Sequence, residues 1–184
     1  MRTYPAESAC GFRYTRAEWG EFSNFYPLPR PIAAAPWSFP TSEHLYQAAK
    51  FAVAPNIQAH IAAAPTARDA ARIGRNRGLP ASPFWNEMRV DAMRWTIRRK
   101  LETVPELLLP ILERTAERPI VEISTRDPFW GAAPADGGTV YRGRNALGRL
   151  WMELRQQLRD GDPRARADAW RDGLTIGKLA ATPD

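Results

Sequence analysis

Prolines set the strongest constraint on how this chain can fold, because they divide its central part into short segments. Seventeen of the 184 residues are proline. A proline inside a helix removes one backbone hydrogen bond and clashes with the preceding turn. Pro55, Pro65, Pro105 and Pro110 therefore limit the length of any helix in this part of the chain. The sequence predicts a succession of short helices there.

Capping residues and apolar periodicity locate these helices. Hydroxyl and proline residues mark their starts, and leucine, isoleucine and tryptophan recur at the spacing of one helical face. We expect the helix that contains Pro110 to bend or break at that residue. The segments predicted to be helical are 40–54, 56–63, 66–73, 82–102, 105–114 and 147–158.

Strand signals are fewer. The first 40 residues are rich in aromatics and prolines, which favours strands and turns, and residues 120–124 alternate between β-branched and polar side chains. Five of the twelve glycines lie between residues 130 and 148, so this stretch is predicted to be a loop. The sequence predicts a mainly helical α+β fold with a small sheet: one domain over 1–160 and a peripheral or mobile tail at 161–184.

Composition excludes several classes of protein. The apolar runs are too short to span a membrane, and the first fifteen residues lack the apolar stretch of a secretory signal, so we expect a cytoplasmic protein. Two histidines and one cysteine cannot build a His/Cys metal site, and no phosphate-loop or dinucleotide fingerprint occurs. We therefore expect no metal and no cofactor. A net charge of +6 favours phosphorylated small molecules or nucleic acid as partners.

The first predicted helix carries one unusual face. Glu43, Tyr46, Gln47 and Lys50 are spaced so that a carboxylate, an amide and an amine align over two turns. The face is a candidate catalytic surface. The alternative is a capped surface helix whose polar side chains are solvated.

Two later segments are further candidates. Asp127-Pro128-Phe129-Trp130-Gly131 follows the predicted strand, where a carboxylate would be held rigidly. It is also an ordinary turn sequence. The segment 143–148 (Gly-Arg-Asn-Ala-Leu-Gly) opens the last helix, where free backbone N–H groups beside Arg144 would suit a phosphate. The alternative is a plain helix cap by Asn145.

These segments together resemble a known family. Residues 21–27 (Glu-Phe-Ser-Asn-Phe-Tyr-Pro), 42–51 (Ser-Glu-His-Leu-Tyr-Gln-Ala-Ala-Lys-Phe), 127–131 and 143–148 are similar, in this order, to the NADAR (YbiA-like) family. The similarity spans roughly Gly20 to Leu158, about three quarters of the chain. It implies an N-glycosidase that cleaves the C–N bond between ribose and an amino group.

The resemblance also implies a set of site residues. Glu43, Lys50 and Asp127 would be catalytic, the two carboxylates beside the sugar and the amine as a possible Schiff-base nucleophile. The resemblance also places Asn24, Trp85, Trp130 and Asn145 at substrate-binding positions. From the motifs described above, we further expect Tyr46, Gln47, Gly131 and Arg144 to bind substrate.

Three functions follow from the resemblance. The first is hydrolysis of the phosphoribosylamino-pyrimidine intermediates of riboflavin synthesis, which releases ribose 5-phosphate. The second is removal of ADP-ribose from guanine in DNA, for which the positive charge would supply phosphate contacts. The third is a pocket that senses ADP-ribose or an NAD derivative without cleavage. The oligomeric state stays open.

Overall fold

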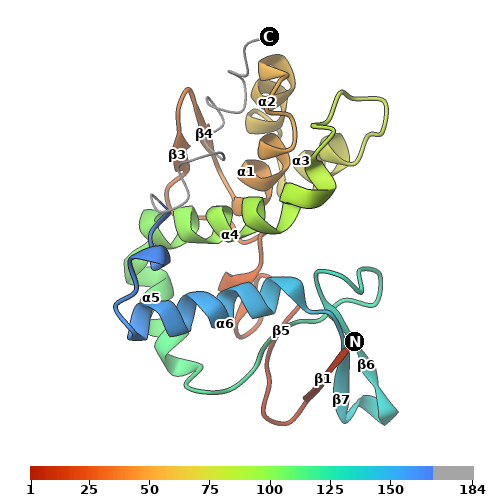
Figure 1. Ribbon diagram of the computed structural model, residues 1–184, viewed down its shortest axis with the longest axis vertical. Helices are drawn as coiled ribbons and strands as arrows, with labels where there is room; N and C mark the ends of the chain where they lie inside the picture. The colour runs from red at the N-terminus through yellow and green to blue at the C-terminus, as the bar shows by residue number, and fades with distance from the viewer. Residues whose placement is uncertain (168–184) are drawn as a thin grey trace. The chain divides into compact units, whose positions relative to one another are not determined.

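The computed structural model describes residues 1–167, which belong to two compact units (Figure 1). Unit 1 comprises Met1–Tyr26 and Pro105–Asp162. Unit 2 comprises residues 27–104 and, among the described residues, 163–167. Helices and short strands occur in both units, which confirms the predicted α+β class.

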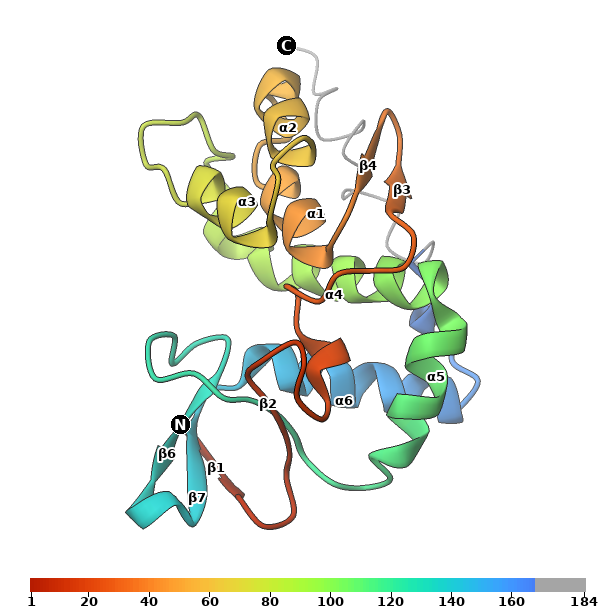
Figure 2. The same cartoon turned by 180° about the vertical axis from the view of Figure 1, so that it is seen from behind.

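The described part of unit 2 contains four α-helices and one hairpin. Its strands β3 (Ile32–Ala34) and β4 (Trp37–Phe39) are antiparallel. Helix α1 contacts each of the three helices that follow it in sequence, and Figure 2 shows α1, α2 and α3 grouped together. The helices are α1 (Ser42–Ala49), α2 (Pro55–Ala62), α3 (Ala67–Gly74) and α4 (Trp85–Thr103).

Helix α1 ends earlier than the sequence predicts. The amide of Lys50 donates to the carbonyl of Gln47, and that of Phe51 donates to the carbonyl of Ala48. Such hydrogen bonds to the third preceding residue tighten the chain out of the α-helix. Phe51 lies in this turn and is fully buried, and the burial of its ring stabilises the fold. If α1 continued, the Phe51 side chain would point in another direction.

The described part of the predicted tail packs on α4. Residues 163–165 form a short 3-10 turn, and the carbonyl of Arg164 accepts a 2.7 Å hydrogen bond from Nε of the buried Arg98. The amide of Ala167 donates to Oε1 of Glu102 at 2.7 Å. The rest of the predicted tail, 168–184, lies outside the described residues.

Unit 1 combines two small sheets with two helices. Strand β7 (Val140–Gly143) lies between β1 (Arg2–Pro5) and β6 (Ala132–Ala135), antiparallel to both. Strand β2 (Cys10–Phe12) pairs in parallel with β5 (Ile120–Glu122), which confirms the predicted strand there.

The predicted loop at 130–148 is wrong, because this segment contains the β6–β7 hairpin. The sequence Ala-Ala-Pro-Ala of β6 shows no alternation of apolar and polar residues, so periodicity does not reveal it. β6 lies at the sheet edge, where a proline such as Pro134 is tolerated.

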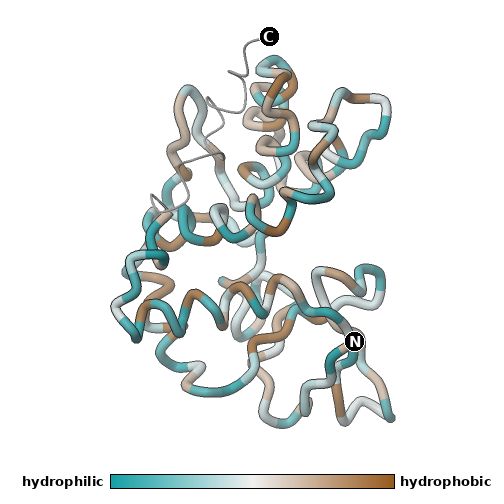
Figure 3. The backbone as a smooth tube through the Cα atoms, viewed as in Figure 1, coloured by the Kyte–Doolittle hydropathy of each residue, from teal (hydrophilic) through white to brown (hydrophobic). Residues whose placement is uncertain are grey.

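The two helices of unit 1 are α5 (Pro105–Arg114) and α6 (Ala146–Arg159). α5 continues through Pro110, so the helix does not break there as predicted, and Pro110 itself is exposed. Apolar and polar residues alternate along α6, as the colours of Figure 3 show. Its buried Trp151 contacts the ring of Phe22 at 5.1 Å and donates from Nε1 to the Phe22 carbonyl.

We predict that Gly148→Ala destabilises unit 1, although the same change in an ordinary helix adds stability. A Cβ at this position would overlap the carbonyl oxygen of Ile120 and lie 2.5 Å from Oδ1 of Asn145. We expect a loss of about 1 to 3 kcal/mol in the free energy of unfolding, measured by urea denaturation. Gly78→Ala is the control, because only Asn76 Oδ1, at 3.3 Å, would lie near its Cβ. Equal stability of both variants would contradict the prediction.

Candidate functional site

The polar residues of α1 are buried, which rules out a solvated surface helix. Thr41 caps the helix by accepting a hydrogen bond from the His44 amide at 3.4 Å. All eight residues of α1 are buried, including Glu43 at 6% and Gln47 at 7% exposure. Burial of a carboxylate and an amide requires partners inside the protein.

Glu43 and Gln47 form the first of these partnerships. Nε2 of Gln47 donates to Oε1 of Glu43 at 2.8 Å. Burial raises the pKa of Glu43 from 4.5 to about 7, against smaller lowering effects from the Gln47 amide and the charge of Arg75. The carboxyl of Glu43 is therefore divided between its acid and base forms near neutral pH.

Lys50, directly after α1, forms the second partnership. Its Nζ donates to the carbonyl oxygen of Gly74, the last residue of α3, at 2.7 Å. Burial lowers the pKa of Lys50. The amine is half-buried, and a lowered pKa increases the fraction of neutral, nucleophilic amine.

Two aromatic side chains pack together beside this cluster. The rings of Tyr46 and Trp85 lie 5.2 Å apart with an interplanar angle of 51°. Trp85 is the first residue of α4 and is half-buried. The structure thus brings five of the predicted residues together in unit 2, namely Glu43, Tyr46, Gln47, Lys50 and Trp85. Helix α1, which carries or precedes four of these residues, contacts α4, which carries Trp85.

In unit 1, Asp127 organises its own loop. Its Oδ1 accepts hydrogen bonds from the amides of Phe129 at 3.0 Å and Trp130 at 2.9 Å. The predicted turn is therefore present, and one carboxylate oxygen of Asp127 holds it. The rings of Phe129 and Trp130 lie 5.0 Å apart, edge to face. Gly131 leaves no room for a side chain, because a Cβ there would lie 2.7 Å from the Glu122 carbonyl oxygen.

The start of α6 does not provide the predicted phosphate site. The amides of Asn145, Ala146 and Leu147 donate to the carbonyls of Gly131, Phe129 and Trp130, respectively, at 3.0 to 3.1 Å. Backbone groups of the Asp127 loop thus satisfy the helix N-terminus, whose unpaired donors would otherwise attract an anion.

Asn145 differs from both sequence interpretations. It is fully buried, has a left-handed φ of 48° and makes no side-chain cap. Its Oδ1 instead accepts from the Glu122 amide at 3.0 Å, and its Nδ2 donates to the Ile120 carbonyl at 2.9 Å. Asn145 ties α6 to β5, so the structure gives it a supporting role. Its contact with substrate stays a prediction.

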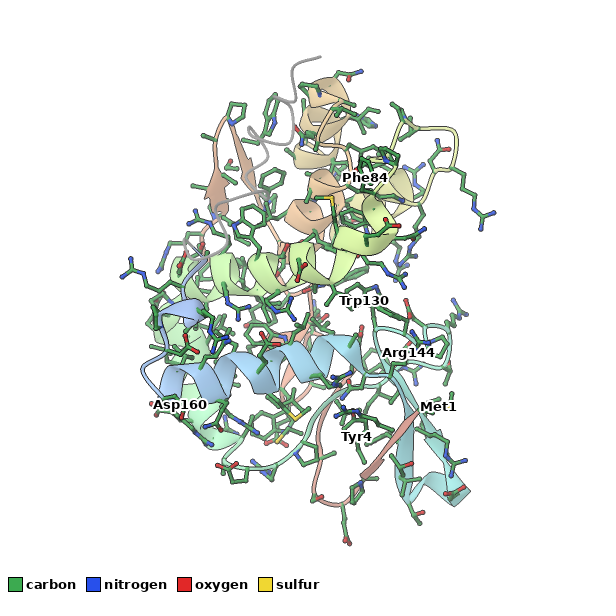
Figure 4. All side chains as sticks on the ribbon, viewed as in Figure 1. Met1, Tyr4, Phe84, Trp130, Arg144 and Asp160 are labelled. Carbon is green, nitrogen blue, oxygen red and sulfur yellow. The ribbon has the colours of Figure 1, made fainter. Side chains whose placement is uncertain are left out.

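Arg144 lines an open cavity in unit 1. The cavity has a volume of about 410 Å³ and is lined by Met1, Pro128, Phe129 and Arg144. The Arg144 guanidinium lies 5.5 Å from the Phe129 ring centre, and Figure 4 labels Arg144 and Met1. A cation beside an aromatic ring suits a phosphorylated or heteroaromatic ligand.

One predicted substrate-binding residue, Asn24, lies near the start of the chain. Asn24, shortly after the 3-10 turn Gly20–Phe22, is buried at 7% exposure. Within residues 1–167, no three His, Cys, Asp or Glu side chains are placed to hold a metal, and no helix is long and apolar enough to cross a membrane. Gly74 was not predicted as a site residue. The sequence gives no sign of its contacts with Gln47 and Lys50 other than a glycine at the end of a helix.

Comparisons with known proteins agree on one family. The model of the NADAR domain matches residues 11–159. N-glycosidase YbiA of Shigella sonnei is 38% identical over 152 residues, covering 83% of this chain and 89% of that protein. Riboflavin biosynthesis protein PYRR of Zea mays, chloroplastic, is 39% identical over 76% of this chain and 23% of that protein. The NMR structure of the E. coli protein YbiA superimposes with a TM-score of 0.70 at 35% identity, covering 83% of this chain and 86% of that one.

We predict that Asn145→Ala lowers the free energy of unfolding and has a smaller effect on the free energy of substrate binding. The substitution removes two hydrogen bonds and leaves the Glu122 amide and the Ile120 carbonyl without these partners. We expect a loss of about 2 to 4 kcal/mol in the free energy of unfolding, measured by urea denaturation. Unchanged stability together with lost ligand binding would contradict the supporting role.

We predict that Glu43→Gln stabilises the protein at pH 8 and changes little below pH 4.5. The pKa of Glu43 is 4.5 in the unfolded chain and about 7 in the folded protein, so folding takes up a proton at pH values between 4.5 and 7. The free energy of unfolding therefore falls as the pH rises through this range. The full effect is about 3 kcal/mol. Thermal denaturation at pH 4 and pH 8 measures it, with the exposed Glu87→Gln as the control. A Glu43→Gln effect that is equal at both pH values would refute the burial penalty.

Proposed function

This chain belongs to the NADAR family, and from that premise we propose that it is an N-glycosidase that hydrolyses the bond between ribose and an amino group. The observation that carries the proposal is the buried Glu43 carboxyl, whose pKa lies at about 7. The names of the YbiA relatives, N-glycosidases, support the same reaction class.

The chemistry of this bond requires an acid. As the C–N bond breaks, positive charge develops at the anomeric carbon and the departing nitrogen needs a proton. Protonated Glu43 supplies that proton, water adds to the anomeric carbon, and the Glu43 carboxylate takes back one proton from that water. The products are the free amine and ribose 5-phosphate. Gln47 keeps the carboxyl in one orientation through its hydrogen bond to Oε1.

Lys50 offers a covalent variant of this reaction. A ribosylamine opens to an imine, and a neutral lysine adds to its carbon and expels the amine, leaving a Schiff base that water hydrolyses. The lowered pKa of Lys50 supports this route. Nζ must first leave the Gly74 carbonyl, to which it donates in the structure. Glu43 then moves the protons between the nitrogen and water.

We propose phosphoribosylamino-pyrimidines as the substrates. The name of the Zea mays relative, a riboflavin biosynthesis protein, supports this class. Within unit 1 taken by itself, Arg144 and Phe129 line a cavity, and a cation beside an aromatic ring suits phosphorylated heteroaromatic compounds such as these. Asp127 remains the predicted second carboxylate, and Asn24 and Trp130 remain predicted substrate contacts.

The assay that tests this function offers two substrates to the purified protein in parallel. One is the phosphoribosylamino-pyrimidine intermediate, and the other is an oligonucleotide that carries ADP-ribosylated guanine. We expect release of ribose 5-phosphate, detected by mass spectrometry. Release of ADP-ribose would instead identify a DNA hydrolase. Tight ADP-ribose binding without any product would identify a sensor.

We predict that Glu43→Gln lowers kcat by about 100-fold or more, because an amide cannot donate the proton. Lys50→Met should lower kcat comparably if the covalent route operates, and borohydride should then trap substrate on the wild-type protein. Glu87→Gln serves as the control with unchanged turnover. Full activity of Glu43→Gln would refute the role of Glu43 as the acid. Near-normal turnover of Lys50→Met would exclude the covalent route, so that water would attack the anomeric carbon directly.

A further inference from the structure

The C-terminal end of α3 contacts Lys50 and Gln47 through Gly74, which was not among the predicted site residues. Gly74 is buried and ends α3. The next amides along the chain, of Arg75 and Asn76, donate to the carbonyls of Ala71 and Ile73. These bonds leave the Gly74 carbonyl at a helix end, where carbonyls lack helical partners. Lys50 Nζ donates to it at 2.7 Å.

The missing side chain of Gly74 is the second contact. A Cβ on Gly74 would overlap Oε1 of Gln47, lie 2.6 Å from its Cδ and lie 3.0 Å from its Cβ. The amide is at the end of a flexible side chain, so an alanine here would be accommodated by moving that amide. Because Gln47 is buried, the amide cannot simply swing into water. Moving it breaks the hydrogen bond from Nε2 to Glu43.

Arg75, the residue after Gly74, acts on Glu43 through its charge. It caps α3, and its positive charge lowers the pKa of Glu43, as does the Gln47 amide, while burial raises it. Adjacent residues of one helix end therefore act on the amine, the amide and the carboxyl of α1.

We propose that Gly74 is a positioning residue: its bare Cα allows Gln47 to hold Glu43, and its carbonyl holds the Lys50 amine. It touches no reacting atom. The kinetic consequence rests on the proposed function, whereas the structural part does not. A side chain at position 74 displaces Gln47 and removes the donor that keeps Glu43 oriented and partly ionised.

The test compares Gly74→Ala, Gln47→Ala and the double variant, with Gly78→Ala as a matched control. The carboxyl pKa of Glu43 is measured by NMR on protein labelled with 13C-glutamate, and the signal is assigned with Glu43→Gln. Gly74→Ala and Gln47→Ala should both raise this pKa, because each removes a hydrogen bond that favours the carboxylate. In the double variant, the pKa should match that of Gln47→Ala alone. An unchanged pKa in Gly74→Ala would overturn the inference.

Kinetics supply the second measurement. Gly74→Ala should lower kcat by about 10- to 100-fold with little change in KM, since a displaced acid harms the transition state rather than substrate binding. The double variant should be no slower than Gln47→Ala. If the wild-type protein turns over no substrate, the proposed function fails, and the NMR pKa still decides the role of Gly74.

Folding provides a last check on the inference. If Gly74→Ala does not fold, Gln47→Ala should restore folding in the double variant, because it removes Oε1 and Cδ of Gln47 and leaves no atom closer than 3.0 Å to a Cβ at position 74. Failure of the double variant to fold would show that Gln47 is not what excludes a side chain at this position. That result would also overturn the inference.

Discussion

The complete burial of α1 is the constraint on which the candidate site depends. A helix with a carboxylate, an amide and a histidine inside the protein is stable only if each polar group finds a partner. Gln47 serves Glu43, and the ring of His44 contacts Thr41 at 2.8 Å and the Ala64 carbonyl at 3.1 Å. The same burial raises the pKa of Glu43, so the packing that holds the helix also prepares its chemistry.

Local signals predicted a good part of this arrangement. The Thr41 cap, the helix α4 and a strand after Pro119 each depend on residues near in sequence, and each is confirmed, although the strand covers only Ile120–Glu122 and buries both Ile120 and Val121. The hairpin at 132–143 was missed because the Ala-Ala-Pro-Ala sequence of β6 does not alternate, and because β1, which pairs with β7, lies more than 130 residues away along the chain. The early end of α1 was missed because it follows from the burial of Phe51, which helical spacing does not encode.

The candidate site, too, was predicted only where local sequence patterns carry the information. The spacing of Glu43, Gln47 and Lys50 indicated one helix face, and the structure confirms that Gln47 and Glu43 are joined on it. The contribution of Gly74 comes from a backbone carbonyl and an absent side chain, and neither leaves a pattern in the sequence. Asn145 resembled a helix cap because Asn commonly caps helices, yet its amide bridges two backbone groups of β5.

The bonds between the Asp127 loop and the start of α6 have a consequence for variation within the family. They join backbone carbonyls of residues 129–131 to amides of residues 145–147, so side-chain identity there matters less than the path of the chain. The two ends of the intervening hairpin are thereby fixed to each other. Residues 136–139 at its tip are exposed. A change in the length of that tip would therefore leave the spacing of the site segments on either side unchanged.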